Sequence, residues 1–100
     1  METSHQSAFE KRRAERLQLQ ISATYEWSGI TCPCQIIDIS SVGIGMRVKG
    51  ILEIGDQVVV ILGKHFLNSK VVRVDGNIIG VAFEAITPEQ LEDIISLRNR

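Results

Sequence analysis

Short strand-like runs separated by turn residues limit the folds open to this chain more than any other feature. The first run extends from Leu17 to Tyr25 and places an apolar residue at every second position. This is the period of a strand that buries one face. Further short strand-like runs punctuated by turn residues follow it, and this spacing predicts an all-β fold.

Six strands are expected between residues 17 and 83. They are Leu17–Tyr25, Cys32–Ile39, Ile44–Val48, Val58–Leu62, Lys64–Val74 and Ile78–Phe83. The clearest turn between them is Asp75-Gly76-Asn77, a strong hairpin signal. Pro33 cannot donate to a ladder, so it is expected near the beginning of its strand or on an edge. Six strands joined by short turns favour a closed antiparallel β-barrel over an open sheet with bare edges.

The period changes after the last strand. Thr87-Pro88-Glu89-Gln90 places a capping Thr before a Pro at the first helical position and a Gln at N3. The residues that follow at helical spacing are Leu91, Ile94, Ile95 and Arg98. They predict an amphipathic α-helix over residues 87–98. Its apolar stripe would pack on the barrel or meet a partner, and packing is favoured because an uncovered stripe reduces solubility.

The chain has 100 residues, which corresponds to one domain with a single core. We expect a flexible polar tail over residues 1–10 and a domain over residues 11–100, with the barrel at 17–84. The N-terminus lacks the apolar segment of a secretory signal, and the longest apolar run, Val58–Leu62, is too short to span a bilayer. The expectation is a soluble, cytoplasmic protein without membrane insertion.

Composition and residue inventory disfavour several functions. The formal net charge of −1 argues against a general nucleic-acid binder, which needs a basic domain. Cys32 and Cys34 are too close for an unstrained disulfide, and the further Cys or His pair that zinc needs does not follow. We expect inert buried thiols and no metal. His5 lies in the tail and His65 in a strand with no nearby acid, so we expect no enzymatic activity.

Basic residues gather just before the first strand, as Lys11, Arg12, Arg13 and Arg16. An arginine can form paired hydrogen bonds with phosphate oxygens or with the O6/N7 edge of guanine. Arg12 and Arg16, four residues apart, can therefore grip an anionic ligand. Taken alone, such a pair is better explained as a solvated basic run.

A second candidate element follows the second strand, from Asp38 to Gly43. Asp38 and Ser40 lie two residues apart at a strand end, so their side chains can project on the same face. A carboxylate there can accept from guanine N1–H and N2–H₂, and a hydroxyl can meet a phosphate. Gly43 allows a positive φ or a close approach of the backbone to a ligand. A side-chain-stabilised turn that closes a hairpin explains the same residues without a ligand.

The two elements together, Arg12-x-x-x-Arg16 before the first strand and Asp38-x-Ser40-x-x-Gly43 after the second, resemble the PilZ domain family. The resemblance continues through Gly43–Met46, Ile79–Phe83 and the predicted helix. It implies a six-stranded antiparallel barrel with a C-terminal helix. It also implies binding of the bacterial second messenger cyclic di-GMP.

Carried over to this chain, the resemblance implies that Arg12 and Arg16 clamp the nucleotide against a wall formed by Asp38, Ser40 and Gly43. Segment 11–16 is then the ligand-clamping segment. Lys11 precedes the first motif arginine, a position at which a basic residue favours two intercalated nucleotides. Arg13 becomes an additional phosphate contact.

The implied protein is a receptor and adaptor, monomeric or homodimeric, whose N-terminal segment changes conformation on binding and relays the signal to a downstream protein. The alternative is a PilZ-like protein-interaction scaffold that does not bind nucleotide. A small barrel that binds oligonucleotides is disfavoured, because Tyr25, Trp27 and Phe66 are too few and too scattered to stack bases.

Overall fold

The computed structural model describes residues 16–97. Its elements are β1 (Leu17–Trp27), β2 (Ile30–Ile39), β3 (Gly43–Val48), β4 (Gln57–Leu62), β5 (His65–Asp75), β6 (Ile78–Phe83) and α2 (Pro88–Ser96). The strand boundaries lie within two residues of the predicted ones. The predicted tail, and Lys11, Arg12 and Arg13, fall outside the described residues.

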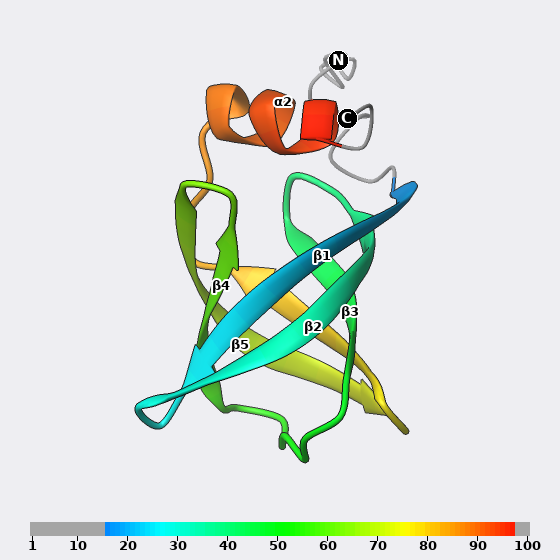
Figure 1. Cartoon of the computed structure of the whole chain (residues 1–100), viewed down its shortest axis with the longest axis vertical. Helices are drawn as coiled ribbons and strands as arrows, with labels where there is room; N and C mark the ends of the chain where they lie inside the picture. The colour runs from blue at the N-terminus through cyan, green and yellow to red at the C-terminus, as the bar shows by residue number, and fades with distance from the viewer. Residues whose placement is uncertain (1–15, 98–100) are drawn as a thin grey trace, which may run out of the picture.

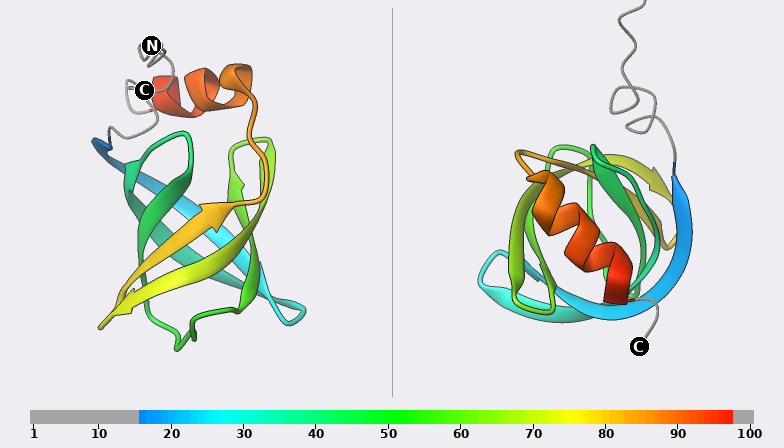
Figure 2. Two further views of the ribbon diagram at one scale, coloured as in Figure 1. Left: turned by 180° about the vertical axis from the view of Figure 1, so that it is seen from behind. Right: turned by 90° about the horizontal axis from the view of Figure 1, so that it is seen from above.

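The strands form a closed barrel in the order β1-β2-β3-β6-β5-β4, and every neighbouring pair is antiparallel (Figures 1 and 2). Closure comes from β1 and β4, where Tyr25 lies opposite Val60. Every strand therefore has a neighbour on each side, although β1 and β4 pair over only three residues each, Thr24–Glu26 and Val59–Ile61. The predicted six-stranded antiparallel barrel with a C-terminal helix is confirmed.

The core follows from the alternation of side chains along each strand. In β4, for example, Val58, Val60 and Leu62 are buried while the residues between them are more exposed. Inward-facing residues from all six strands meet in one cluster. Its fully buried members include Ile36, Ile39, Ile44, Met46, Val60, Leu62 and Ile94.

Pro33 lies fourth in β2, opposite Thr24 of β1. The ladder between β2 and β3 begins one residue later, at Cys34 and Val48. The proline therefore occupies the stretch of β2 that β3 does not reach, where a missing donor costs no hydrogen bond to β3. The predicted position near the beginning of the strand is confirmed.

Helix α2 lies across one end of the barrel, as the view along the barrel in Figure 2 shows. Thr87 caps it: its hydroxyl oxygen accepts from the Gln90 N–H at 3.1 Å, and the Gln90 side chain accepts from the Thr87 N–H at 2.9 Å. Ile94 is fully buried in the barrel core. The expectation that the apolar stripe packs on the barrel is therefore confirmed. Within residues 16–97, no helix has the length and apolar character needed to cross a membrane.

We expect Ile94→Ala to lower the free energy of unfolding by about 2–5 kcal/mol, because it removes a buried side chain and leaves a cavity between α2 and the barrel. Glu92→Ala is the matched control, because Glu92 is exposed on the same helix and its loss should change stability by less than about 0.5 kcal/mol. Urea denaturation measures both. Equal stability of the two variants would contradict the packing of α2 as part of one cooperative unit.

Candidate functional site

The connection between β2 and β3 places the predicted turn residues at the end of the barrel that α2 covers (Figure 1). Asp38 is the last but one residue of β2 and lies opposite Gly45 of β3. The register between the strands shifts between Ile36 and Asp38. Such irregularities re-aim side chains, and here the shift sets Asp38 beside Gly45 on the outer face of the barrel.

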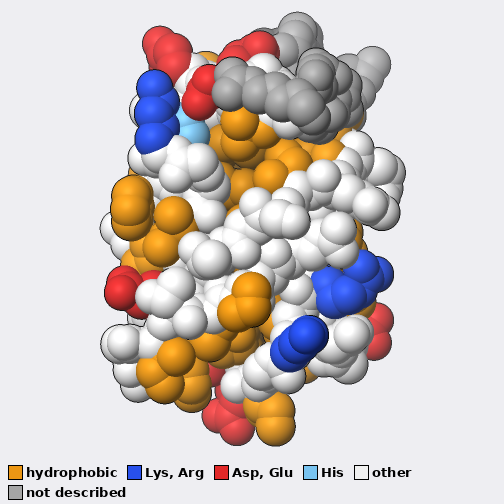
Figure 3. All heavy atoms as spheres, in the orientation of Figure 1, with side chains coloured by type: hydrophobic (Ala, Val, Ile, Leu, Met, Phe, Trp, Pro, Cys, Tyr) orange, Lys and Arg blue, Asp and Glu red, His pale blue; other side chains and the backbone are white. Residues whose placement is uncertain are grey.

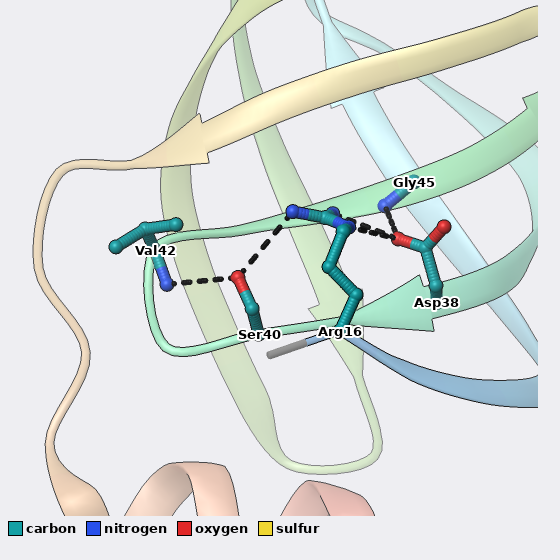
Figure 4. A network of polar contacts seen from close by, with 5 residues as sticks. All are labelled: Arg16, Asp38, Ser40, Val42 and Gly45. Atoms are coloured by element: carbon teal, nitrogen blue, oxygen red, sulfur yellow. Dashed lines mark hydrogen bonds and ion pairs between the residues drawn. The ribbon is translucent and has the colours of Figure 1, made fainter. Parts of the chain in front are cut away.

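Arg16 reaches this turn from the beginning of β1. Leu17 lies opposite Ile39, so the preceding arginine falls beside Ser40 and Asp38. Its Nε and Nη2 donate to Asp38 Oδ1 at 2.9 and 2.7 Å (Figure 4). The Gly45 N–H donates to the same oxygen at 3.0 Å. Asp38 Oδ1 thus accepts three hydrogen bonds, whereas Oδ2 accepts none from the residues described here.

Ser40 organises the turn itself. Its hydroxyl oxygen accepts from the Val42 N–H at 3.2 Å and, at a longer 3.4 Å, from Arg16 Nη1. Its own N–H donates to the Gly43 carbonyl at 2.9 Å. Ser40 is only 4% exposed. The structure therefore contains the side-chain-stabilised turn that explains these residues without a ligand, and Arg16 is added to it.

The Arg16 guanidinium retains donors beyond this network. A guanidinium has five N–H groups, and three of them bind Asp38 and Ser40, which leaves two. The arginine side chain is 38% exposed, so solvent screens its attraction to Asp38. The ion pair therefore orients the two side chains more than it stabilises the fold. The result is an oriented cation with two remaining donors, next to a carboxylate oxygen with remaining acceptor capacity.

A glycine is needed at position 43 because β3 lies very close to β6 there. Its φ is not positive, and a Cβ at this position would overlap the carbonyl oxygen of Val81 in β6, with Ala82 Cα at 3.3 Å. The close approach predicted for this glycine is therefore an approach to the neighbouring strand. Its carbonyl also closes the Ser40 turn.

Gly45 is a site residue that the sequence analysis missed. A Cβ there would lie 2.8 Å from Asp38 Oδ1, and the Gly45 N–H is one of the donors to that oxygen. Gly45 therefore positions the carboxylate. The signal in the sequence was the spacing of two in Gly43-Ile44-Gly45, which puts both glycines on one face of a strand.

The expectation that His65 has no nearby acid is wrong. His65 Nε2 lies 2.6 Å from Asp93 Oδ2. The two residues are 28 positions apart and meet because α2 folds back across the end of the barrel, where β5 begins. The pair links α2 to the barrel, and no local sequence pattern indicates this contact.

Cys32 and Cys34 are free and half-buried rather than buried. Burial, together with the neighbouring Cys32, raises the pKa of the Cys34 thiol to about 11. A thiol with this pKa is protonated near neutral pH, and the protonated form is a poor nucleophile and metal ligand. In residues 16–97, no group of three or more His, Cys, Asp or Glu side chains is arranged to hold a metal ion.

Charge is unevenly distributed on the face shown in Figure 3. Acidic side chains gather at the α2 end, and basic side chains occur in separate places rather than as a continuous surface. The sequence of α2 explains the acidic end, with Glu89, Glu92 and Asp93. The described residues on this face form no continuous basic track of the kind that follows a nucleic-acid backbone.

Comparisons with known proteins identify the family and the fold. A family model described as "PilZ domain" matches residues 10–99. Among solved structures, the chain is similar to the PilZ domain of CeSA from a cellulose-synthesizing bacterium, with a TM-score of 0.62 and 15% sequence identity. The match covers 86% of this chain and 96% of that one. At this identity the structural likeness concerns the fold. No curated protein matches the sequence.

Proposed function

The chain belongs to the PilZ domain family, and on that premise we propose that it is a cyclic di-GMP receptor which binds the nucleotide on the outer face of β2 and β3. PilZ domains are known as binding and adaptor domains rather than enzymes. The ligand carries two phosphates and two guanines, so a local basic clamp suffices in a chain whose net charge is −1.

The observation that carries the proposal is the joint network of Arg16, Asp38 and Ser40. Asp38 Oδ1 already accepts hydrogen bonds within the protein. Oδ2 is therefore the oxygen left to accept from guanine N1–H and N2–H₂. It orients Arg16 so that its two remaining N–H groups can donate to a phosphate. Charge-assisted hydrogen bonds of this kind contribute roughly 1.5–3 kcal/mol each.

The remaining residues of the proposed site complete the clamp. Arg12 precedes Arg16 by four positions, a span of up to about 14 Å in an extended chain, so it can close over a nucleotide that rests on the turn. Arg13 adds a phosphate contact. Lys11 favours two intercalated nucleotides. Gly43 contributes through the turn that its carbonyl closes and through the approach of β3 to β6.

Signal output would then depend on the N-terminal segment. We propose that residues 1–16 change conformation as Arg12 and Arg16 engage the ligand, and that the new surface is recognised by a downstream protein in the cytoplasm. Ordering a segment around a ligand is a common way to switch a protein surface.

Isothermal titration calorimetry of the full chain with cyclic di-GMP tests the proposal. We expect saturable binding with a dissociation constant on the order of micromolar or tighter, and two nucleotides per chain if Lys11 acts as proposed. A folded protein that gives no heat of binding at tens of micromolar ligand would contradict the proposal. Such a result would favour a protein-interaction scaffold that does not bind nucleotide.

A further inference from the structure

A row of four residues crosses the outer face of the barrel from β2 to β5. Asp38 lies opposite Gly45, Gly45 lies opposite Gly80, and Gly80 lies opposite Arg73. The two central positions are glycines, which we call the glycine pair. Because neither has a side chain, nothing in this row separates the carboxylate of Asp38 from the guanidinium of Arg73.

Both outer side chains lean over the glycine next to them. A Cβ at Gly45 would lie 2.8 and 3.0 Å from the two carboxylate oxygens of Asp38. A Cβ at Gly80 would lie 3.3 Å from Cβ, 3.4 Å from Nε and 3.6 Å from Cζ of Arg73. The glycine pair is a direct cross-strand pair, with Cα atoms about 5 Å apart. The two charged groups are therefore held over neighbouring backbone positions.

Arg73 has no competing partner in the part of the chain that the structure describes. Its guanidinium forms no hydrogen bond or ion pair with residues 16–97, and the residue is exposed. It does not pair with Asp38, whose Oδ1 is already occupied by Arg16 and the Gly45 N–H. An acceptor and a set of donors thus stand side by side without satisfying each other.

We propose that Asp38 and Arg73 together read the edge of a guanine that lies over the glycine pair. Guanine presents the acceptor O6 directly beside the donors N1–H and N2–H₂. With the donors on Asp38 Oδ2, O6 faces Arg73, which can donate to it. Arginine pairs favourably with the O6/N7 edge of guanine in general. Arg73 is thereby a specificity-determining residue of the binding site.

The same arrangement rejects adenine. In the place of O6, adenine carries the N6 amino group, a donor, which would meet the N–H groups of Arg73. In the place of N1–H it carries an unprotonated nitrogen, an acceptor, which would meet the carboxylate. The first contact would place donors against donors, and the second would place an acceptor against an acceptor. Buried or partly buried polar groups left unpaired in this way cost affinity.

This inference rests on the proposed function, so its test compares variants of a protein first shown to bind cyclic di-GMP. We expect Arg73→Ala to weaken cyclic di-GMP binding by about ten-fold, as measured by calorimetry. The affinity for cyclic di-AMP, measured by competition, should not fall, because adenine presents the N6 donor where guanine presents O6, so the substitution removes no favourable contact with adenine. The ratio of the two affinities, which measures the preference for guanine, should therefore fall.

Lys49→Ala is the control, because it also removes one exposed positive charge but lies in the 49–56 connection, at the end of the barrel opposite to α2 (Figure 1). It should leave both affinities unchanged. Arg73→Ala should retain the wild-type melting temperature, since Arg73 is exposed. If Arg73→Ala bound cyclic di-GMP like the control, or lost both nucleotides equally, the assignment would be overturned while the proposed function stood. Absence of binding by the wild-type chain would overturn the proposed function instead.

Discussion

Alanine in place of Asp38 is expected to weaken cyclic di-GMP binding by about 100-fold or more and to leave the barrel folded. The substitution removes Oδ2, the proposed acceptor for the guanine donors. It also removes Oδ1, to which two Arg16 nitrogens donate, so Arg16 loses the orientation that directs its remaining donors to a phosphate. Two charge-assisted hydrogen bonds at roughly 1.5–3 kcal/mol each exceed the 2.8 kcal/mol or so that 100-fold requires.

The barrel should tolerate this loss. Asp38→Ala leaves the Gly45 N–H without its acceptor, a cost of about 1–3 kcal/mol, against a typical domain stability of about 5–15 kcal/mol. Asp56→Ala is the matched control, because Asp56 Oδ2 also accepts a backbone N–H, from Glu53 at 2.8 Å, in the 49–56 connection. Calorimetry and urea denaturation of both variants separate the effects. Binding by Asp38→Ala within two-fold of wild type would remove Asp38 from the site.

The barrel was predictable because its cause is local. The first strand alternates at a period of two, the others are short strand-like runs, and turns such as Asp75-Gly76-Asn77 limit how far consecutive strands can separate. The order of the strands was not predictable in the same way. The residue pattern of β3 and β6 is the same whichever strands they join, and the pairing of β1 with β4 closes the barrel across more than thirty residues of sequence.

The candidate site likewise combines residues whose proximity follows from local sequence with residues that only the fold brings together. The proximity of Asp38, Ser40 and Arg16 was predictable, because the first two come from one short turn and a resemblance connected Arg16 to it. Their role in ligand binding stays a prediction. The contact between His65 and Asp93 was missed because it depends on how α2 folds back. Arg73 looks like any exposed strand residue, and only the register of three successive ladders sets it beside Asp38.

The two glycines of β3 illustrate how one short motif serves both the fold and the site. Gly43 and Gly45 face the same side of the strand, yet their missing side chains make room for different neighbours. At Gly43 the neighbour is the backbone of β6, at Val81 and Ala82. At Gly45 it is the side chain of Asp38. Backbone within a closed barrel cannot move aside, whereas a carboxylate on an outer face can rotate.

We therefore expect Gly43→Ala to lower the free energy of unfolding by about 3 kcal/mol, the upper part of the range for overpacking, because the new Cβ would overlap the Val81 carbonyl oxygen and force β3 away from β6. Urea denaturation measures the loss, which should occur with or without nucleotide. Gly45→Ala is the comparison: it should remain within about 1 kcal/mol of wild type but bind cyclic di-GMP more weakly, because Asp38 is displaced. Equal stability of the two variants would contradict the close approach of β3 to β6 at Gly43.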